Sequence, residues 1–240
     1  MTYLEVVNSV LKRLRESTVS TVTENAYSAL VGEFVNDAKR EVEDAYQWST
    51  LLDYVDITTA PGVATYFLND STTGVRNAAI TERARLWIDP DENSPLALIT
   101  DSTRETRLHH ISPTESYLYL QQANNQGAQY RPEQFKIKTI PTLVSGKWNK
   151  QLELAPTPDD AYTVRLFIVN PQNDLSAASD VLRVPQSPVI QRAYLYCLYE
   201  RGEELGETLT LTAVKAKEAL DTAIALDQQV TTQEMAFTVA

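Results

Sequence analysis

The sequence predicts an α+β fold: helix pairs from the two ends of the chain form one helical bundle, and an antiparallel β-sandwich-like lobe is inserted between them. Apolar residues recur every three or four positions near both termini, as in amphipathic helices, but alternate with polar residues through the middle of the chain. Each terminal helix needs a partner for its apolar stripe. Packing the terminal pairs against each other meets that need.

These patterns divide the 240 residues into four segments. We expect the N-terminal helices in residues 1–52 and the C-terminal helices in 186–228. The β-rich lobe, with one short helix, occupies 53–185. Residues 229–240 form a tail with little local structure signal.

Two helices are expected before the lobe. Thr2 and Glu5 have the spacing of a capping box at the start of the first, and Thr21 and Glu24 repeat it before the second, which ends near Leu51. The inner stripe of the second helix comprises Tyr27, Leu30, Phe34, Ala38, Val42 and Ala45. Its charged outer face comprises Glu33, Asp37, Lys39, Arg40, Glu43 and Asp44.

Strands are expected where the period changes to two. The candidate segments are residues 54–58, 63–68, 83–88, 96–100, 134–140, 151–154 and 162–169. Clusters of Pro, Asn and Asp separate them, which favours an antiparallel sandwich over alternating βαβ units. The run Ser112-Pro113-Thr114-Glu115 predicts a short helix over residues 112–122.

Two further helices follow the lobe. Ser187-Pro188 combines a cap residue with a first-turn proline and predicts the start of one helix. A last helix runs from about Thr208 to Gln228, with an apolar side that comprises Leu209, Ala213, Ala216, Leu220, Ala223 and Ile224.

Composition excludes several classes of protein. A hydrophobic fraction of 43% and a charged fraction of 22% are ordinary for a folded chain, while a net charge of −11 argues against a clamp built on phosphate neutralisation. The single cysteine, Cys197, cannot form an internal disulfide, and its apolar neighbours predict a buried thiol. We expect neither a signal peptide nor a membrane span.

No residue cluster predicts catalysis, a metal or a cofactor. His109-His110 are adjacent and point to opposite faces of a strand, so they favour ordinary histidines over a metal pair. Residues 89–93 imitate the start of a calcium loop but lack its glycine and its bidentate glutamate, which favours a solvated turn. The carboxylate pairs Asp159-Asp160 and Glu203-Glu204 are explained by exposure to solvent.

The chain resembles the head-to-tail adaptor proteins of tailed bacteriophages, in particular the tail tubular protein A type. Three stretches carry the resemblance. They are residues 34–42 with Trp48, which include the core positions Phe34, Asn36 and Ala38; the β segments 131–135, 152–158 and 162–166; and the late helix with Ile190-Gln191-Arg192-Ala193 and 200–203. Gln129-Tyr130 departs from the family, in which a glycine often precedes the Arg-Pro pair.

The resemblance implies a non-enzymatic structural protein of the virion, made in the host cytoplasm and placed at the head-tail junction. Copies of the protein, usually twelve, form a ring beneath the portal that extends the DNA channel and docks the nozzle or tail fibres. The C-terminal segment would reach into the portal, and its apolar residues Met235, Phe237 and Val239 are the expected contacts. The helix face of Glu33, Asp37, Lys39 and Arg40 would meet the neighbouring copy.

Two other classes of protein stay open. A protein- or glycan-binding module that uses the β lobe explains the sandwich, but it leaves the capped terminal helices and the tail unexplained. A hydrolase acting through carboxylates is the weaker alternative, and turnover of a glycan would support it.

Overall fold

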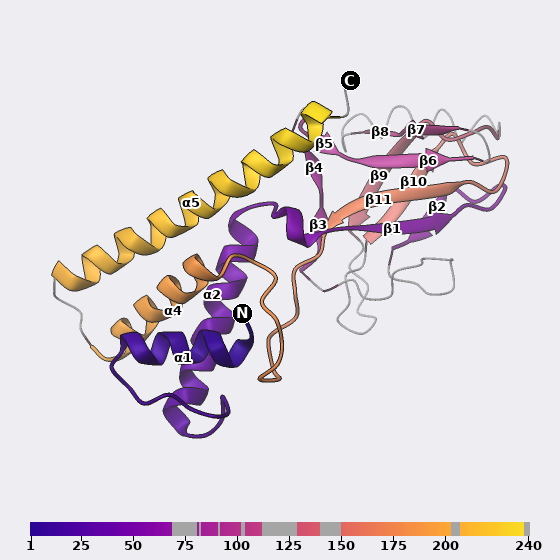
Figure 1. The fold of residues 1–240 in the computed structure, drawn as a ribbon. Helices are drawn as coiled ribbons and strands as arrows, with labels where there is room; N and C mark the ends of the chain where they lie inside the picture. The colour runs from indigo at the N-terminus through magenta and orange to yellow at the C-terminus, as the bar shows by residue number, and fades with distance from the viewer. Residues whose placement is uncertain are drawn as a thin grey trace. The chain divides into compact units, whose positions relative to one another are not determined.

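The structure is a computed structural model that describes residues 1–68, 81, 83–90, 92–101, 104–111, 129–139, 150–202 and 207–237. The predicted helix at 112–122 lies outside these residues. The chain folds into two compact units. The helical unit comprises residues 1–51 and 171–240, and the β unit comprises residues 52–170 (Figure 1).

Four helices build the described part of the helical unit. They are α1 (Tyr3–Arg13), α2 (Ala26–Ala45), α4 (Gln186–Glu200) and α5 (Glu207–Phe237), with a short 3-10 turn η1 (Ser49–Leu51) after α2. α2 packs against α1 and α4, α1 also contacts α4, and α5 lies along α4 (Figure 1). The α+β class, with helices from both chain ends and a β region inserted between them in the sequence, is confirmed.

Capping explains where the first two helices begin. The predicted box at α1 is present: Thr2 Oγ1 accepts from the Glu5 amide and Glu5 Oε2 accepts from the Thr2 amide at 2.8 Å. The box predicted at Thr21 is wrong, because α2 is capped by Asn25, whose Oδ1 accepts from the Ser28 amide at 2.8 Å. The Glu24 carboxylate instead turns back to the amide of Ser20.

The buried face of α2 is rotated relative to the predicted stripe. The buried apolar residues of α2 are Val31, Val35, Ala38 and Val42. Of the other residues of the predicted stripe, Tyr27, Leu30 and Phe34 are half-buried and Ala45 is exposed. The shift follows from α1, which approaches α2 so closely that a methyl group at Gly32 would lie 2.5 Å from Tyr3 Oη. The spacing of apolar residues along a helix does not show on which side a neighbouring helix packs most closely.

The ends of α4 and α5 also differ from prediction. α4 begins at Gln186, so Ser187 and Pro188 lie inside its first turn and no side chain caps it. α5 continues to Phe237, nine residues past the expected end at Gln228, because no glycine or proline interrupts the sequence there. The predicted inner side of α5 is confirmed: Ala216 is buried, and Leu209, Ala213, Leu220, Ala223 and Ile224 are half-buried.

The β unit contains two sheets among its described residues. One has the order β1 (Leu52–Thr58), β11 (Thr163–Val169), β6 (Ala97–Thr100) and β7 (Glu105–Arg107), and β3 (Arg85–Leu86) also pairs with β11. The other has the order β2 (Thr65–Phe67), β10 (Lys150–Ala155), β9 (Gln134–Thr139) and β8 (His109–His110). β4 (Ile88–Asp89) and β5 (Ser94–Pro95) form a separate hairpin.

The two sheets share one core, as the predicted sandwich requires. Alternate residues of each sheet enter it, among them Val55, Ile57, Ile99, Val164 and Leu166 from the first and Tyr66, Phe135, Leu152 and Leu154 from the second. The described strands pair antiparallel except for β8 and β9, which run parallel, with His109 opposite Gln134, and an isolated bridge between Gln129 and Thr157 is also parallel. Sequence alternation does not encode strand direction, so this pair was not predicted.

Residues 171–184 form a strap between β11 and α4 that belongs to the helical unit, although the sequence places them in the lobe. Backbone hydrogen bonds join the strap to the N-terminus: the Tyr3 amide donates to Asp180 O at 2.7 Å, and the Leu182 amide donates to Met1 O at 3.0 Å. Such pairing between segments far apart in the chain has no local sequence signal.

Candidate functional site

In the segment that imitates a calcium loop, the acidic side chains of Asp89 and Glu92 pair with an arginine. Arg107 Nη1 lies 2.6 Å from Asp89 Oδ2, and Arg107 Nη2 lies 3.1 Å from Glu92 Oε2. Asn93 takes a left-handed conformation with φ of 48°, which lets the chain turn between β4 and β5. The interpretation as a turn is therefore supported, with Arg107 neutralising its acids.

Two of the other candidate side chains, His110 and Asp159, have structural roles. His109 is exposed, and His110 packs its edge against Phe135 with ring centroids 5.2 Å apart. Asp159 accepts a hydrogen bond from Tyr162 Oη at 2.7 Å, which secures the turn before β11. Glu203 and Glu204 lie outside the described residues. Within the described ranges, no group of His, Cys, Asp and Glu side chains has a metal-binding arrangement.

The single cysteine lies in the core of the helical unit. Cys197 is 1% exposed, as predicted, and burial raises the pKa of its thiol to about 12. A thiol held in its neutral form is a poor nucleophile, so Cys197 acts as a small apolar side chain.

The motif residues of α2 hold the helical unit together. Asn36 forms two hydrogen bonds with the backbone of Leu175 in the strap, of 3.1 Å to its carbonyl and 2.9 Å from its amide. Trp48 is fully buried and donates from Nε1 to Val42 O at 2.6 Å. The ring of Phe34 packs against that of Tyr196 of α4, with ring centroids 6.0 Å apart, and Ala38 is buried.

The arginines of the two remaining motifs also join elements within their units. Arg192 of α4 reaches Glu41 of α2 at 2.5 Å, and Arg201 after α4 reaches Glu16 at 2.6 Å and Tyr27 Oη at 2.8 Å. Arg131, before β9, donates to Thr106 Oγ1 at 2.9 Å and lies 3.3 Å from Asp101, so it secures the turn between β6 and β7. Each of these motif arginines therefore stabilises the unit to which it belongs.

The predicted outer face of α2 is only partly exposed. Glu33 and Asp37 face solvent, and Arg40 pairs with Asp37 at 3.2 Å and with Asp174 of the strap. Lys39 and Glu43 are both fully buried, which corrects the assignment of these two residues to the outer face. The Nζ of Lys39 contacts Glu43 at 3.3 Å and donates to the carbonyls of Gln172 at 2.7 Å and Asn173 at 3.1 Å.

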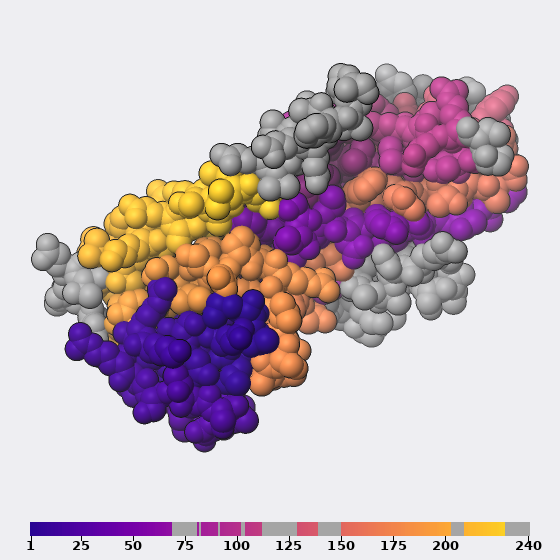
Figure 2. All heavy atoms as spheres, in the orientation of Figure 1, coloured from indigo at the N-terminus to yellow at the C-terminus, as the bar shows by residue number. Residues whose placement is uncertain are grey.

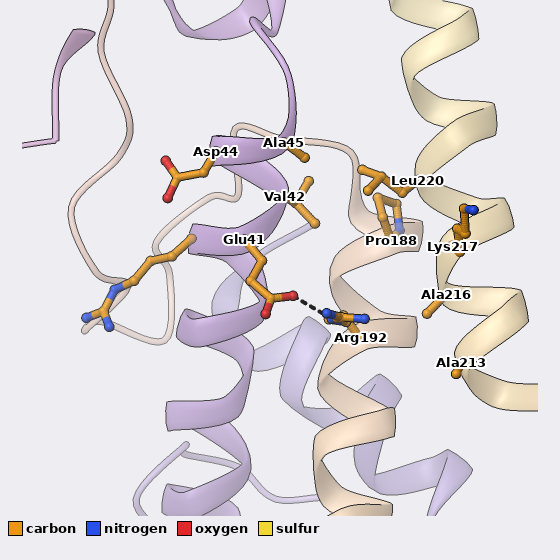
Figure 3. Close-up of a pocket in the computed structure, with 11 residues that line it drawn as sticks. Glu41, Val42, Asp44, Ala45, Pro188, Arg192, Ala213, Ala216, Lys217 and Leu220 are labelled. Atoms are coloured by element: carbon orange, nitrogen blue, oxygen red, sulfur yellow. Dashed lines mark hydrogen bonds and ion pairs between the residues drawn. The ribbon is translucent and has the colours of Figure 1, made fainter. Parts of the chain in front are cut away.

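A groove of about 710 Å³ lies over α4, between α2 and α5 (Figure 3). Its charged members include the Glu41–Arg192 pair and Lys217. Burial opposes the charge on Glu41, but hydrogen bonds from Arg192 and Tyr196 outweigh burial and lower the pKa of this carboxyl. Its apolar lining comprises Val42, Ala45, Pro188, Ala213, Ala216 and Leu220.

α5 carries exposed apolar residues that the sequence patterns did not single out. Leu211 is 53% exposed and Val214 is 47% exposed, one turn apart on the side of α5 away from its buried residues Thr212 and Ala216. The sequence could have indicated them, because Leu211 and Val214 are two apolar residues three positions apart that do not belong to the predicted inner side of the helix. The side chains of Met235 and Phe237, and the whole of Val239, lie outside what the structure describes.

The helical unit thus presents a groove and an exposed helix face, which suit a protein that works by assembly with other proteins. The chain matches the SU10 adaptor protein family over residues 1–239 and belongs to that family. It is a bacteriophage adaptor, a structural and non-enzymatic class of virion protein. No curated protein matches the chain.

The expected adaptor resemblance is therefore confirmed at the level of the phage adaptor, while the narrower tail tubular protein A type stays a prediction. None of the helices among the described residues is both long enough and apolar enough to cross a membrane.

Proposed function

We propose that twelve copies of this protein form a ring below the portal, which extends the DNA channel and docks the tail nozzle or tail fibres. Membership of the SU10 adaptor family over the whole chain is the observation that carries this proposal. An adaptor has to offer one surface to its neighbour in the ring and others to the parts above and below. The separate helical and β units provide distinct surfaces for these contacts.

The contact with the portal is assigned to the C-terminal end of the chain. Met235, Phe237 and Val239 are apolar residues in a polar stretch, and the first two lie at the end of α5. A helix end with apolar side chains suits insertion into a groove of a partner protein.

The contact with the neighbouring copy is assigned to α2. Glu33, Asp37 and Arg40 remain the proposed residues, and Lys39 is excluded because it is buried within its own chain. Charges at the rim of an interface set register and rate of association more than affinity.

DNA passes through the proposed ring without specific binding. The helical unit carries most of the chain's net negative charge. An acidic channel wall does not form the long-lived phosphate contacts that lysine and arginine would make. We therefore expect a largely acidic lumen, and a ring structure with a basic lining would contradict this expectation.

Native mass spectrometry of the protein, alone and mixed with the portal ring of the same phage, tests the proposal. The expected result is addition of one complete ring of subunits to the portal. If no association occurs at any salt concentration, the adaptor ring is wrong, and the β unit becomes the candidate binding module, to be tested against glycans and proteins.

A further inference from the structure

The groove over α4 has the shape of a binding groove for a helix. Three helices border it, and its small side chains, Ala45, Ala213 and Ala216, allow a close approach of another backbone. Val42, Pro188 and Leu220 complete an apolar floor. An apolar groove of this size between helices suits an amphipathic helix that presents one or two anchor residues.

The outward face of α5 has the complementary character. Leu211 and Val214 protrude one turn apart and would serve as anchors. Glu218 and Asp221 follow at the next turns of the same face, and neither forms an ion pair within the part of the chain that the structure describes. The face therefore offers an apolar end followed by an acidic end.

Charge complementarity favours a second copy of α5 as the occupant of the groove. Lys217 lies at the rim, is exposed, and has no ion-pair partner among the described residues. Glu218 or Asp221 of an incoming helix would meet it when Leu211 and Val214 occupy the apolar floor.

The groove and the outward face lie on different sides of α5. Figure 2 shows the atoms of α5 in yellow beside those of α4 in orange, and Figure 3 shows the side of α5 that lines the groove. Ala213, Ala216 and Leu220 face the groove, while Leu211 and Val214 point away from the α4 side. One copy can therefore give its face to one neighbour and receive another neighbour's face in its groove. Such a heterologous contact repeats from copy to copy and closes into a ring when the rotation permits.

We infer that, in the assembled protein, the outward face of α5 of each copy seats in the α2–α4–α5 groove of the next copy, with Leu211 and Val214 as anchors. This inference rests on the proposed ring and specifies the surfaces that build it. Arg40, one of the α2 residues proposed for the contact between copies, borders the same groove.

Cysteine cross-linking tests the contact directly. A chain with both Ala45→Cys and Val214→Cys, assembled on the portal ring and treated with a short bismaleimide, should give a ladder of covalent products up to the full ring. A mixture of the two single variants should stop at dimers. Native Cys197 should not interfere, since it is 1% exposed. The control pair Ala45→Cys with Val63→Cys places the second thiol on a residue of similar exposure in the β unit.

A matched pair of charge substitutions tests the energetic role of the anchor. Val214→Asp should raise the protein concentration needed for half-occupancy of the portal ring at least tenfold, whereas Val63→Asp should leave it unchanged. Circular dichroism and thermal unfolding should match the parent for both, because both valines are exposed. The readout is therefore assembly and not folding.

The outcomes separate the contact from the ring itself. If the parent chain forms a complete ring on the portal, but the double variant gives no ladder and Val214→Asp assembles normally, the contact is wrong and the ring stands. If the parent chain does not add to the portal at all, the ring is wrong and the contact falls with it. A ladder together with impaired assembly of Val214→Asp supports both.

Discussion

At the scale of single residues, the helical unit is held by a buried ion pair that also binds backbone. Lys39 and Glu43 have no exposed side-chain surface, and together they satisfy the amide and carbonyl of Gln172 and the carbonyl of Asn173. Each group compensates for the burial of another, since an unpaired charge in this position would lose its hydration without replacement. The pair therefore fixes the start of the strap on α2.

Replacement of Lys39 by Met should lower the free energy of unfolding by about 3–5 kcal/mol, because it leaves the Glu43 carboxylate buried without its cation. The double variant Lys39→Met with Glu43→Leu should lose less than the sum of the two single losses. Urea denaturation of the four proteins measures this coupling. Additive losses would mean that the two side chains do not act as a pair.

Cys197 and Tyr196 predict how stability depends on pH. Burial is the main cause in both cases: it raises the pKa of the Cys197 thiol from 9.0 to about 12 and that of the Tyr196 hydroxyl from 10.0 to about 12. The unfolded chain therefore loses these protons at lower pH than the folded chain. This contribution to stability is complete below about pH 9 and is lost as the pH rises towards 12.

We expect the free energy of unfolding to fall between pH 9 and 11, and to fall less steeply in Cys197→Ala. The slope against pH is the readout, since the smaller side chain also changes stability at neutral pH. Denaturant titrations at several pH values measure it. Equal slopes for the parent and Cys197→Ala would show that this thiol keeps its ordinary pKa in the folded chain.

At the scale of elements, two asparagines clamp connecting segments onto helices by the same geometry. Asn8 of α1 exchanges two hydrogen bonds with the backbone of Val19, of 2.9 and 2.8 Å, as Asn36 of α2 does with Leu175. A side-chain amide donates and accepts at once and so replaces a backbone partner that these segments lack. One clamp holds the α1–α2 connection, and the other holds the strap.

Asn36→Ala should release the strap without releasing the α1–α2 connection. Two lost hydrogen bonds predict a loss of about 1–3 kcal/mol in the free energy of unfolding. Hydrogen exchange should accelerate at the Leu175 amide in Asn36→Ala and at the Val19 amide in Asn8→Ala, so each variant is the control for the other. Uniform acceleration across the helical unit would show global destabilisation in place of local release.

At the scale of the whole molecule, α5 is anchored to the helical unit and continues beyond its anchor. Asp227 accepts from the Ser49 amide at 3.0 Å and from Ser49 Oγ at 2.6 Å, which fixes the helix against the turn after α2. Ten further residues continue the helix to Phe237. The anchor precedes the proposed portal contacts, so folding and docking are assigned to separate parts of one helix.

Truncation after Gln228 should therefore abolish attachment to the portal and leave the fold intact. The shortened chain keeps Asp227 and the whole contact of α5 with α4 that the described side chains show. Native mass spectrometry with the portal ring measures attachment, and thermal unfolding checks the fold. Unchanged attachment would contradict the assignment of Met235, Phe237 and Val239.

Sequence by itself determined the features that depend on neighbouring residues. The α+β class, the capping box of Thr2 and Glu5, the buried thiol of Cys197 and the inner side of α5 follow from periods and spacings within a few turns or strands. The order of helices and strands follows in the same way, because one period is replaced by another along the chain. These features need no knowledge of what lies opposite.

Tertiary structure decided the features that depend on residues far apart in the chain. Lys39 is charged and reads as a surface residue, yet it is buried because carbonyl groups more than 130 residues away accept its hydrogen bonds. The rotated face of α2, the strap and the groove over α4 likewise arise only where distant segments meet. A local pattern states which side chains need burial, and packing decides which neighbours provide it.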